Sequence, residues 1–142
     1  MFVTGAPRAG TTFVGQVLSL PLSVDYLHEP FNRADLEGFS HRFQYIRAVP
    51  DTEEMRVYSR SVDRVLAYDF SISTEIPPDD PLSRQLAKRI VGGRGAYYLR
   101  IAKLNPFHTA AVVKDPTAAL LGNFLRTRYG VHPVACCRAG FG

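Results

Sequence analysis

Cysteine is scarce in this chain. Its 142 residues include only two cysteines, Cys136 and Cys137, which are adjacent. Two adjacent cysteines form neither a disulfide framework nor the spaced ligand pairs of a zinc site. We therefore expect both to be small apolar strand residues in a reducing compartment, and we expect the protein to be cytoplasmic and to use no metal.

Long apolar runs and blocks of like charge are also absent. No run of about 18 apolar residues could span a bilayer, and no basic segment precedes an apolar core as in a signal peptide. The 17 basic and 13 acidic residues give a net charge of +4 that is spread along the sequence. This charge suits a pocket for an anionic nucleotide, whereas a nucleic-acid surface needs a concentrated basic patch. We predict no membrane span, no signal peptide and no nucleic-acid partner.

The sequence contains no internal repeat and no low-complexity segment. Its hydrophobic content of 46% and charged content of 21% are those of an ordinary globular protein. A chain of 142 residues can bury a core but leaves no room for a second unit. We therefore expect one soluble domain over residues 1–142.

A short strand-like segment at the amino terminus runs into a glycine-rich loop. Residues 2–4 have strand character, the loop extends from Gly5 to Gly10, and apolar residues at helical spacing follow Thr11. The two glycines allow backbone conformations that a side chain disfavours, so that successive N–H groups can converge on one anion. The free N–H groups and positive dipole of the following helix would point at the same place. The segment predicts a phosphate site.

The loop has the length of a Walker A motif but lacks its lysine. Thr11 stands where Walker A has Lys, and the cation is instead Arg8, inside the loop. A strand-to-helix turn that binds nothing is the alternative, because glycines in such turns are common for packing reasons alone.

The next segments predict a helix, a strand and a polar turn. The helix from Thr11 should end at Leu20, because Pro21 cannot continue it. A short strand should follow over residues 23–27 and lead into polar residues 28–32. Polar residues at the carboxyl end of a strand are where α/β folds place their chemistry.

Residues 38–66 show helical periodicity with an apolar face and a charged face. The expected inward positions are Phe39, Phe43, Ile46, Met55, Tyr58, Val62, Val65 and Leu66, and the expected solvated charges are Arg42, Arg56 and Arg64. Residues 76–81 predict a loop, and a further helix carrying Leu82, Leu86 and Ile90 should be closed by Gly92 and Gly93.

The last third of the chain predicts a buried strand, a helix and a final strand. Residues 110–113 form a continuous apolar run, as buried parallel strands do. Asp115 should cap the next helix and Pro116 should lie in its first turn. That helix should carry Leu121, Phe124 and Leu125 inward and Arg126 and Arg128 outward, and it should end near Gly130. A strand over residues 131–137 follows. Strands alternating with helices predict an α/β fold with a parallel sheet.

Four segments, in this order, resemble the sulfotransferases that use 3′-phosphoadenosine 5′-phosphosulfate (PAPS), in particular the bacterial type. They are Pro7-Arg8-Ala9-Gly10-Thr11-Thr12, His28-Glu29-Pro30-Phe31-Asn32, Val113-Lys114-Asp115-Pro116 and the strand from Val131 to Arg138. The resemblance implies a three-layer fold like that of P-loop NTPases, with a parallel central sheet.

The resemblance also implies transfer of a sulfuryl group from PAPS, as co-substrate, to an acceptor hydroxyl on a small molecule or glycan. Pro7, Arg8, Ala9, Gly10, Thr11 and Thr12 would hold the 5′-phosphosulfate, and Arg138 the 3′-phosphate. Arg8 and the loop amides would stabilise the developing charge without Mg²⁺.

Glu29 would be the general base, helped by burial that raises its pKa, and His28 is the rival base. Strand alternation predicts that these two side chains point to opposite sides. Glu29 serving only as a cap or pairing with Arg8 is the alternative. Lys114 could bind phosphosulfate or acceptor, or pair with a neighbour. Asp115 is expected to cap a helix and not to act in catalysis.

After Arg138 the chain departs from the family pattern. The family continues with His-Pro and a helix whose Ser shares the 3′-phosphate, whereas this chain has only residues 139–142. We therefore expect a domain truncated at its carboxyl end, which keeps the 5′ half of the donor site and lacks part of the 3′ half. Two other functions stay open: a P-loop kinase or NTPase, against which the missing lysine counts, and a non-catalytic nucleotide-binding remnant.

Overall fold

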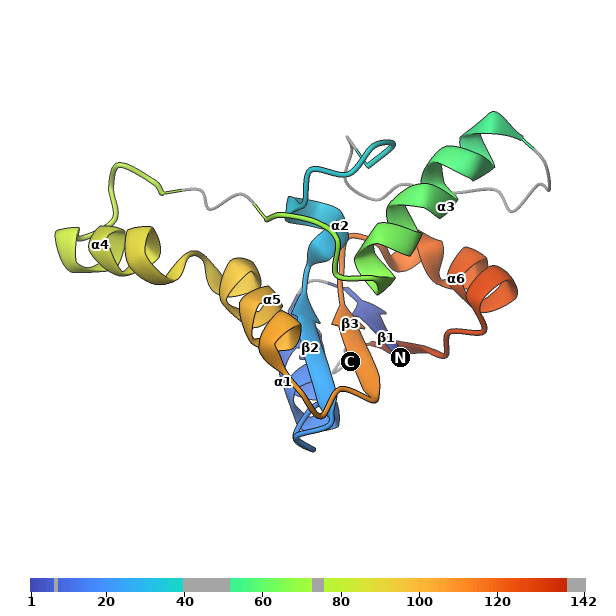
Figure 1. Ribbon diagram of the computed structural model, residues 1–142, viewed down its shortest axis with the longest axis horizontal. Helices are drawn as coiled ribbons and strands as arrows, with labels where there is room; N and C mark the ends of the chain where they lie inside the picture. Colours follow the sequence, from blue (N-terminus) through green and yellow to red (C-terminus); the bar gives the residue numbers. More distant parts are fainter. Residues whose placement is uncertain (7, 40–51, 73–75, 138–142) are drawn as a thin grey trace, which may run out of the picture.

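The computed structural model describes residues 1–6, 8–39, 52–72 and 76–137. Its strands and helices alternate along the sequence (Figure 1). The strands are β1 (Phe2–Gly5), β2 (Val24–His28), β3 (Ala110–Lys114) and β4 (Pro133–Cys136). The helices are α1 (Thr11–Leu18), α2 (Pro30–Arg33), α3 (Glu53–Leu66), α4 (Leu82–Val91), α5 (Arg94–Leu104), the 3₁₀ turn η1 (Ala119–Leu121) and α6 (Gly122–Tyr129).

The four strands form one sheet in the order β2-β3-β1-β4, and every neighbouring pair is parallel. This confirms the predicted α/β fold with a parallel sheet. The register pairs His28 with Lys114 and Gly5 with Cys136. Because carboxyl ends of parallel strands meet at one edge, the polar residues that follow β2 and β3 lie beside the loop that follows β1.

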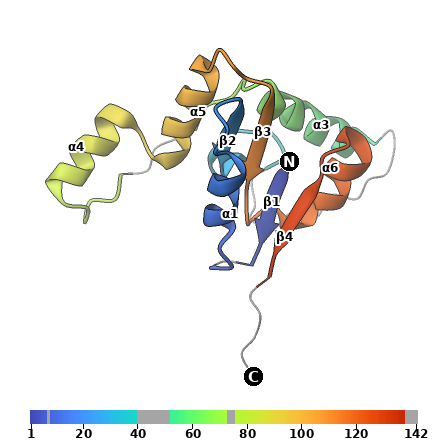
Figure 2. The same cartoon turned by 90° about the horizontal axis from the view of Figure 1, so that it is seen from below.

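Helices cover both faces of the sheet, because side chains alternate along each strand. Phe2, Leu27 and Val113 point to the face covered by α3 and α6, where they join the larger apolar core. Val3, Tyr26 and Val112 point to the opposite face, where α1 packs. Figure 2 shows α1 on one side of the strands and α3 with α6 on the other. This arrangement is compatible with a three-layer α/β fold.

The amphipathic pattern of α3 is confirmed for most positions. Met55, Tyr58, Val62 and Val65 are buried, whereas Arg56 and Arg64 are exposed. The prediction for Leu66 was wrong, because this last residue of the helix is 43% exposed. The helix begins at Glu53, after Thr52 accepts a hydrogen bond from the N–H of Met55.

The helical pattern expected before α3 is only partly described. Arg42, Phe43 and Ile46 lie outside the described residues. Phe39 is described, and it lies in a loop, not in the expected helix, while its ring packs against the core.

Two predicted helix boundaries differ from the structure. Helix α1 ends at Leu18, two residues before the predicted end, and the Ser19 hydroxyl donates to the carbonyl of Gln16. The helix predicted from Pro116 begins later, as η1 and then α6, because the Asp115 side chain caps the N–H of Thr117 in a turn before the helix. Its inward and outward residues and its end at Gly130 are as predicted.

Helix α5 was missed by the sequence analysis. It packs along the edge strand β2, and Gly95 allows the contact because a Cβ at this position would lie 3.0 Å from the carbonyl oxygen of His28. The preceding helix α4 and its Gly92 terminus are as predicted, with φ of 86° at the glycine. Leu82, Leu86 and Ile90 of α4 are exposed, and Figure 1 shows this helix projecting from the rest of the fold. Over the described parts of the chain, each helix is too short or too polar to cross a bilayer.

Candidate functional site

The loop after β1 turns through three residues of positive φ. Gly5, Arg8 and Gly10 have φ values of 145°, 64° and 79°. Both glycines therefore adopt the conformations that the sequence analysis assigned to them, and Arg8 adopts a left-handed conformation that is uncommon for a residue with a side chain. A Cβ on Gly5 would lie 2.1 Å from the carbonyl oxygen of Cys136, so the start of the loop also requires glycine for space.

Helix α1 begins directly after this loop. Its first intrahelical hydrogen bond runs from the N–H of Val14 to the carbonyl of Gly10 at 3.0 Å. The N–H groups of Thr11, Thr12 and Phe13 precede that bond, so the helix itself offers them no acceptor. These N–H groups and the positive end of the helix dipole make the helix start a suitable place for an anion.

A cleft of about 600 Å³ opens at the start of α1. It brings together residues from the β1 loop and helix α1 with residues that follow β2 and β3. They are Arg8, Gly10, Thr11, Thr12, Phe13, Gln16, Glu29, Lys114 and Pro116. Arg8 is exposed at this cleft, whereas Lys114 is buried. Two cations, a helix start and one carboxylate therefore face one space.

Glu29 leaves the strand direction directly after β2. It has φ of 54° and ψ of 50°, and it is the N-cap residue of the short helix α2, whose first residue is Pro30. The expected alternation of His28 and Glu29 was wrong for this reason, because alternation applies only while the chain stays extended. The turn brings Oε1 of Glu29 to 3.7 Å from Nε2 of His28.

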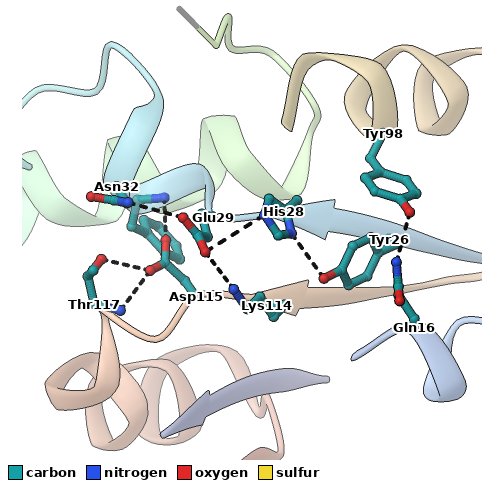
Figure 3. Close-up of polar contacts among 10 residues, drawn as sticks. Gln16, Tyr26, His28, Glu29, Asn32, Tyr98, Lys114, Asp115 and Thr117 are labelled. Atoms are coloured by element: carbon teal, nitrogen blue, oxygen red, sulfur yellow. Dashed lines mark hydrogen bonds and ion pairs between the residues drawn. The ribbon is translucent and has the colours of Figure 1, made fainter. Parts of the chain in front are cut away.

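Lys114 is the principal cationic partner of Glu29 (Figure 3). Its Nζ lies 2.5 Å from Oε1 of Glu29, and the two side chains are 4% and 15% exposed. Asn32 donates to the other carboxylate oxygen, Oε2, at 3.1 Å. Of the two roles considered for Lys114, pairing with a neighbour is therefore observed, and Lys114 also lines the cleft at the start of α1.

The pKa of Glu29 moves in the direction opposite to the one expected. Burial alone would raise the pKa, but the hydrogen bond and charge of Lys114 outweigh it, with smaller contributions from His28 and Asn32. The pKa of Glu29 is therefore held below its usual value, and the carboxylate is ionised at neutral pH. In this arrangement it can accept a proton only weakly.

A second buried carboxylate lies behind the cleft. Asp115 is fully buried and accepts hydrogen bonds from the N–H of Phe31 at 2.9 Å, the N–H of Thr117 at 3.0 Å and the Thr117 hydroxyl at 2.7 Å. Burial raises the pKa of Asp115 to about 6, although the Thr117 hydrogen bonds oppose this shift. Asp115 thereby ties the start of α2, next to Glu29, to the turn after β3. It caps that turn, whereas a helix cap was expected.

A chain of aromatic and polar side chains extends from Glu29 along β2. Nδ1 of His28 lies 3.1 Å from the hydroxyl of Tyr26, and the Tyr26 ring packs edge-on against Tyr98 of α5, with ring centroids 4.7 Å apart. The Tyr98 hydroxyl accepts a hydrogen bond from Gln16, which lines the cleft. The sequence analysis did not single out Tyr26, Tyr98 or Gln16. Tyr26 is two residues before His28, so strand periodicity could have indicated that both lie on one face.

The predicted site residues are only partly brought together. Arg8, Gly10, Thr11, Thr12 and Glu29 share the cleft, and His28 lies behind Glu29. Ala9 belongs to the loop, where its N–H donates to the carbonyl of Ala6. Pro7 and Arg138 lie outside the described residues. Within the described ranges, no three His, Cys, Asp or Glu side chains converge in the manner of a metal site.

Comparison with models of protein families, with curated proteins and with solved structures returned no match to this chain.

Proposed function

We propose that this chain is a sulfotransferase that transfers a sulfuryl group from PAPS to an acceptor hydroxyl, and that its fold is of the P-loop NTPase type. The observation that supports this most is the convergence, in one cleft, of the α1 helix start, Arg8, Lys114 and Glu29. The first three groups favour an anion, and the carboxylate lies 2.5 Å from one of the cations, where it can reach a proton beside that anion. The order of motifs along the sequence adds to this support.

The reaction needs positioning, charge stabilisation and one proton acceptor. The acceptor oxygen forms a bond to sulfur, the bond from sulfur to the 5′-phosphate oxygen breaks, and adenosine 3′,5′-bisphosphate leaves. Arg8, Lys114 and the first N–H groups of α1 stabilise the charge that builds on the leaving oxygen. Glu29 accepts the proton of the attacking hydroxyl.

The ion pair of Glu29 and Lys114 belongs to the ligand-free chain. A phosphosulfate in the cleft competes with Glu29 for Nζ of Lys114, because both are anions within reach of one ammonium group. Loss of that partner removes the hydrogen bond and the charge of Lys114, which both lower the pKa of the carboxylate, so its pKa rises and it becomes a better base. The donor therefore prepares the base before transfer.

The test combines donor binding with sulfate transfer. The full chain is incubated with PAPS carrying labelled sulfate and with a mixture of alcohol, phenol and sugar acceptors, and binding of adenosine 3′,5′-bisphosphate is followed by calorimetry. We expect the rate of transfer in Glu29→Gln to be lower than in the wild-type chain by a factor on the order of 10² to 10⁴, with donor affinity retained or raised, because the carboxylate that competes for Lys114 is removed. Equal rates in the two proteins would exclude Glu29 as the base.

One observation favours a second candidate function, a nucleotide-binding module without turnover. The resting Glu29 is ionised and paired with Lys114, which a purely structural ion pair explains equally well. Binding of adenosine 3′,5′-bisphosphate without transfer to any acceptor would establish this alternative. Hydrolysis of ATP that depends on Mg²⁺ and is lost in Thr12→Ala would instead indicate a P-loop NTPase.

A further inference from the structure

The hydroxyl of Tyr26 is buried next to the imidazole of His28. It lies 3.1 Å from Nδ1, and the tyrosine as a whole is 6% exposed. The ring of Tyr98 packs edge-on against the ring of Tyr26 and helps to keep water away from the Tyr26 hydroxyl. In the part of the chain that the structure describes, Nδ1 of His28 is the one hydrogen-bond partner of this hydroxyl.

The hydroxyl of Tyr26 is the donor in this hydrogen bond. Burial raises the pKa of Tyr26 well above its usual value, so the phenol keeps its proton. If the oxygen accepted a proton from Nδ1 instead, its own buried proton would have no acceptor, which is costly in an apolar setting. The O–H therefore donates, and Nδ1 is the accepting nitrogen.

In the neutral imidazole, the single proton then lies on Nε2. A neutral imidazole carries one N–H, and the nitrogen that accepts a hydrogen bond is the unprotonated one. Nε2 of His28 lies 3.7 Å from Oε1 of Glu29, which is longer than a hydrogen bond but close enough for a favourable dipole–charge contact. The opposite tautomer would direct a nitrogen lone pair at the carboxylate.

We infer that Tyr26 is a positioning residue that holds His28 in its Nε2–H form, so that His28 supports the carboxylate of Glu29 and does not act as the base. The contact between Tyr26 and His28 is independent of any reaction. The catalytic consequence rests on the proposed function. The hydroxyl of Tyr26 thus decides which of the two candidate bases, Glu29 or His28, can accept the proton.

The tautomer is measured directly by two-dimensional ¹⁵N NMR of the histidine side chains in the full, ligand-free chain near neutral pH. We expect the Nε2–H form of His28 in the wild-type chain. Tyr26→Phe removes the donor with little change of shape and should shift the tautomer ratio by up to about tenfold toward Nδ1–H. Tyr98→Phe is the matched control, because it removes a neighbouring hydroxyl that bonds to Gln16 and should leave the His28 ratio unchanged.

Sulfate transfer provides the second readout. Tyr26→Phe should move the acid limb of the pH profile to higher pH with an unchanged KM for PAPS, because Glu29 loses a supporting N–H and its pKa rises. An Nδ1–H tautomer in the wild-type chain would overturn the inference and return His28 to the role of base. If the wild-type chain transfers no sulfate while His28 shows the Nε2–H form, the proposed function fails and the positioning by Tyr26 stands.

Discussion

Replacement of Lys114 by methionine tests the ion pair at the centre of the cleft without reference to any reaction. Methionine fills much of the same space as the lysine stem but carries no charge. Lys114→Met leaves Glu29, whose side chain is 15% exposed, beside a neutral group in place of its closest cation.

The size of the effect follows from the burial of the pair. Removing one partner of a buried ion pair costs about 3–5 kcal/mol, because the other charge stays desolvated without compensation. Glu29 keeps Asn32 and His28 as partners, so we expect the low end, about 3 kcal/mol in the free energy of unfolding. Glu29→Gln should cost a similar amount, because it leaves the Lys114 ammonium buried.

The double variant Glu29→Gln/Lys114→Met completes a double-mutant cycle, which measures the interaction between the two side chains. With both charges removed, the site is neutral, and replacement of a whole buried pair is often near neutral in stability. We expect the double variant within about 1 kcal/mol of the wild-type chain, and therefore a coupling energy of about 5 kcal/mol between the two residues. Urea unfolding at pH 7 with unchanged m values measures all four proteins.

The pH dependence provides an independent check. The folded-state pKa of Glu29 lies below its ordinary value of 4.5, so the stability that this group contributes is present above that value and is lost as the pH falls through the folded-state pKa. The difference in stability between the wild-type chain and Lys114→Met should therefore shrink in acid. A cost below about 1 kcal/mol for Lys114→Met, or additive costs in the double variant, would show that Lys114 does not stabilise the carboxylate of Glu29.

Three further predictions concern the loop, the buried carboxylate and the exposed arginine. Gly5→Ala should lower the free energy of unfolding in urea by at least about 3 kcal/mol, because its Cβ would lie 2.1 Å from the Cys136 carbonyl oxygen. Gly10→Ala should cost only about 1–2 kcal/mol, since no atom lies within 4 Å of its Cβ and only the left-handed φ of 79° is strained. Equal costs for the two variants would contradict the steric requirement at Gly5. Asp115 has a pKa raised by burial to about 6, so the folded chain holds its proton more tightly than the unfolded chain, and stability should fall by about 2 kcal/mol as the pH rises from 4 to 7. Asp115→Asn should remove that dependence, and an unchanged profile would contradict the assignment. Arg8→Ala should weaken the binding of adenosine 3′,5′-bisphosphate, measured by calorimetry, by roughly 10- to 100-fold, which is the scale of one charge-assisted hydrogen bond. The free energy of unfolding should change by less than about 0.5 kcal/mol, because Arg8 is exposed. Unaltered affinity would exclude Arg8 from the site.

The elements with strong local signals could be predicted from the sequence. The strand, loop and helix at residues 2–18 follow from a short apolar run, two glycines and a helical period, all within one stretch of chain. Helix α3 follows from periodicity, and the buried strand β3 from a continuous apolar run. Helix α5 was missed because the reason for its glycine lies in another part of the chain. Gly95 allows the helix to approach β2 closely, and only the folded arrangement shows this contact.

The cleft itself depends on strand order, which no local pattern contains. Lys114 meets Glu29 because β2 and β3 are neighbours in register, with His28 opposite Lys114, although these residues are far apart in the sequence. The ion pair considered from the sequence joined the carboxylate of Glu29 to Arg8, whereas the structure joins it to Lys114. That choice is made by burial: the Lys114 side chain is 4% exposed, whereas Arg8 stays at the surface.

One backbone conformation decides the chemistry available at the end of β2. With an extended Glu29, His28 and Glu29 would face opposite sides of the sheet, and one of them alone could reach the anion site. The left-handed turn at φ of 54° instead brings the carboxylate beside both the imidazole of His28 and the ammonium of Lys114. Pro30 marks this turn in the sequence, because a residue before proline is disfavoured from continuing into a right-handed helix. A carboxylate in that turn is held by partners on two strands, so its pKa depends on contacts with both His28 and Lys114.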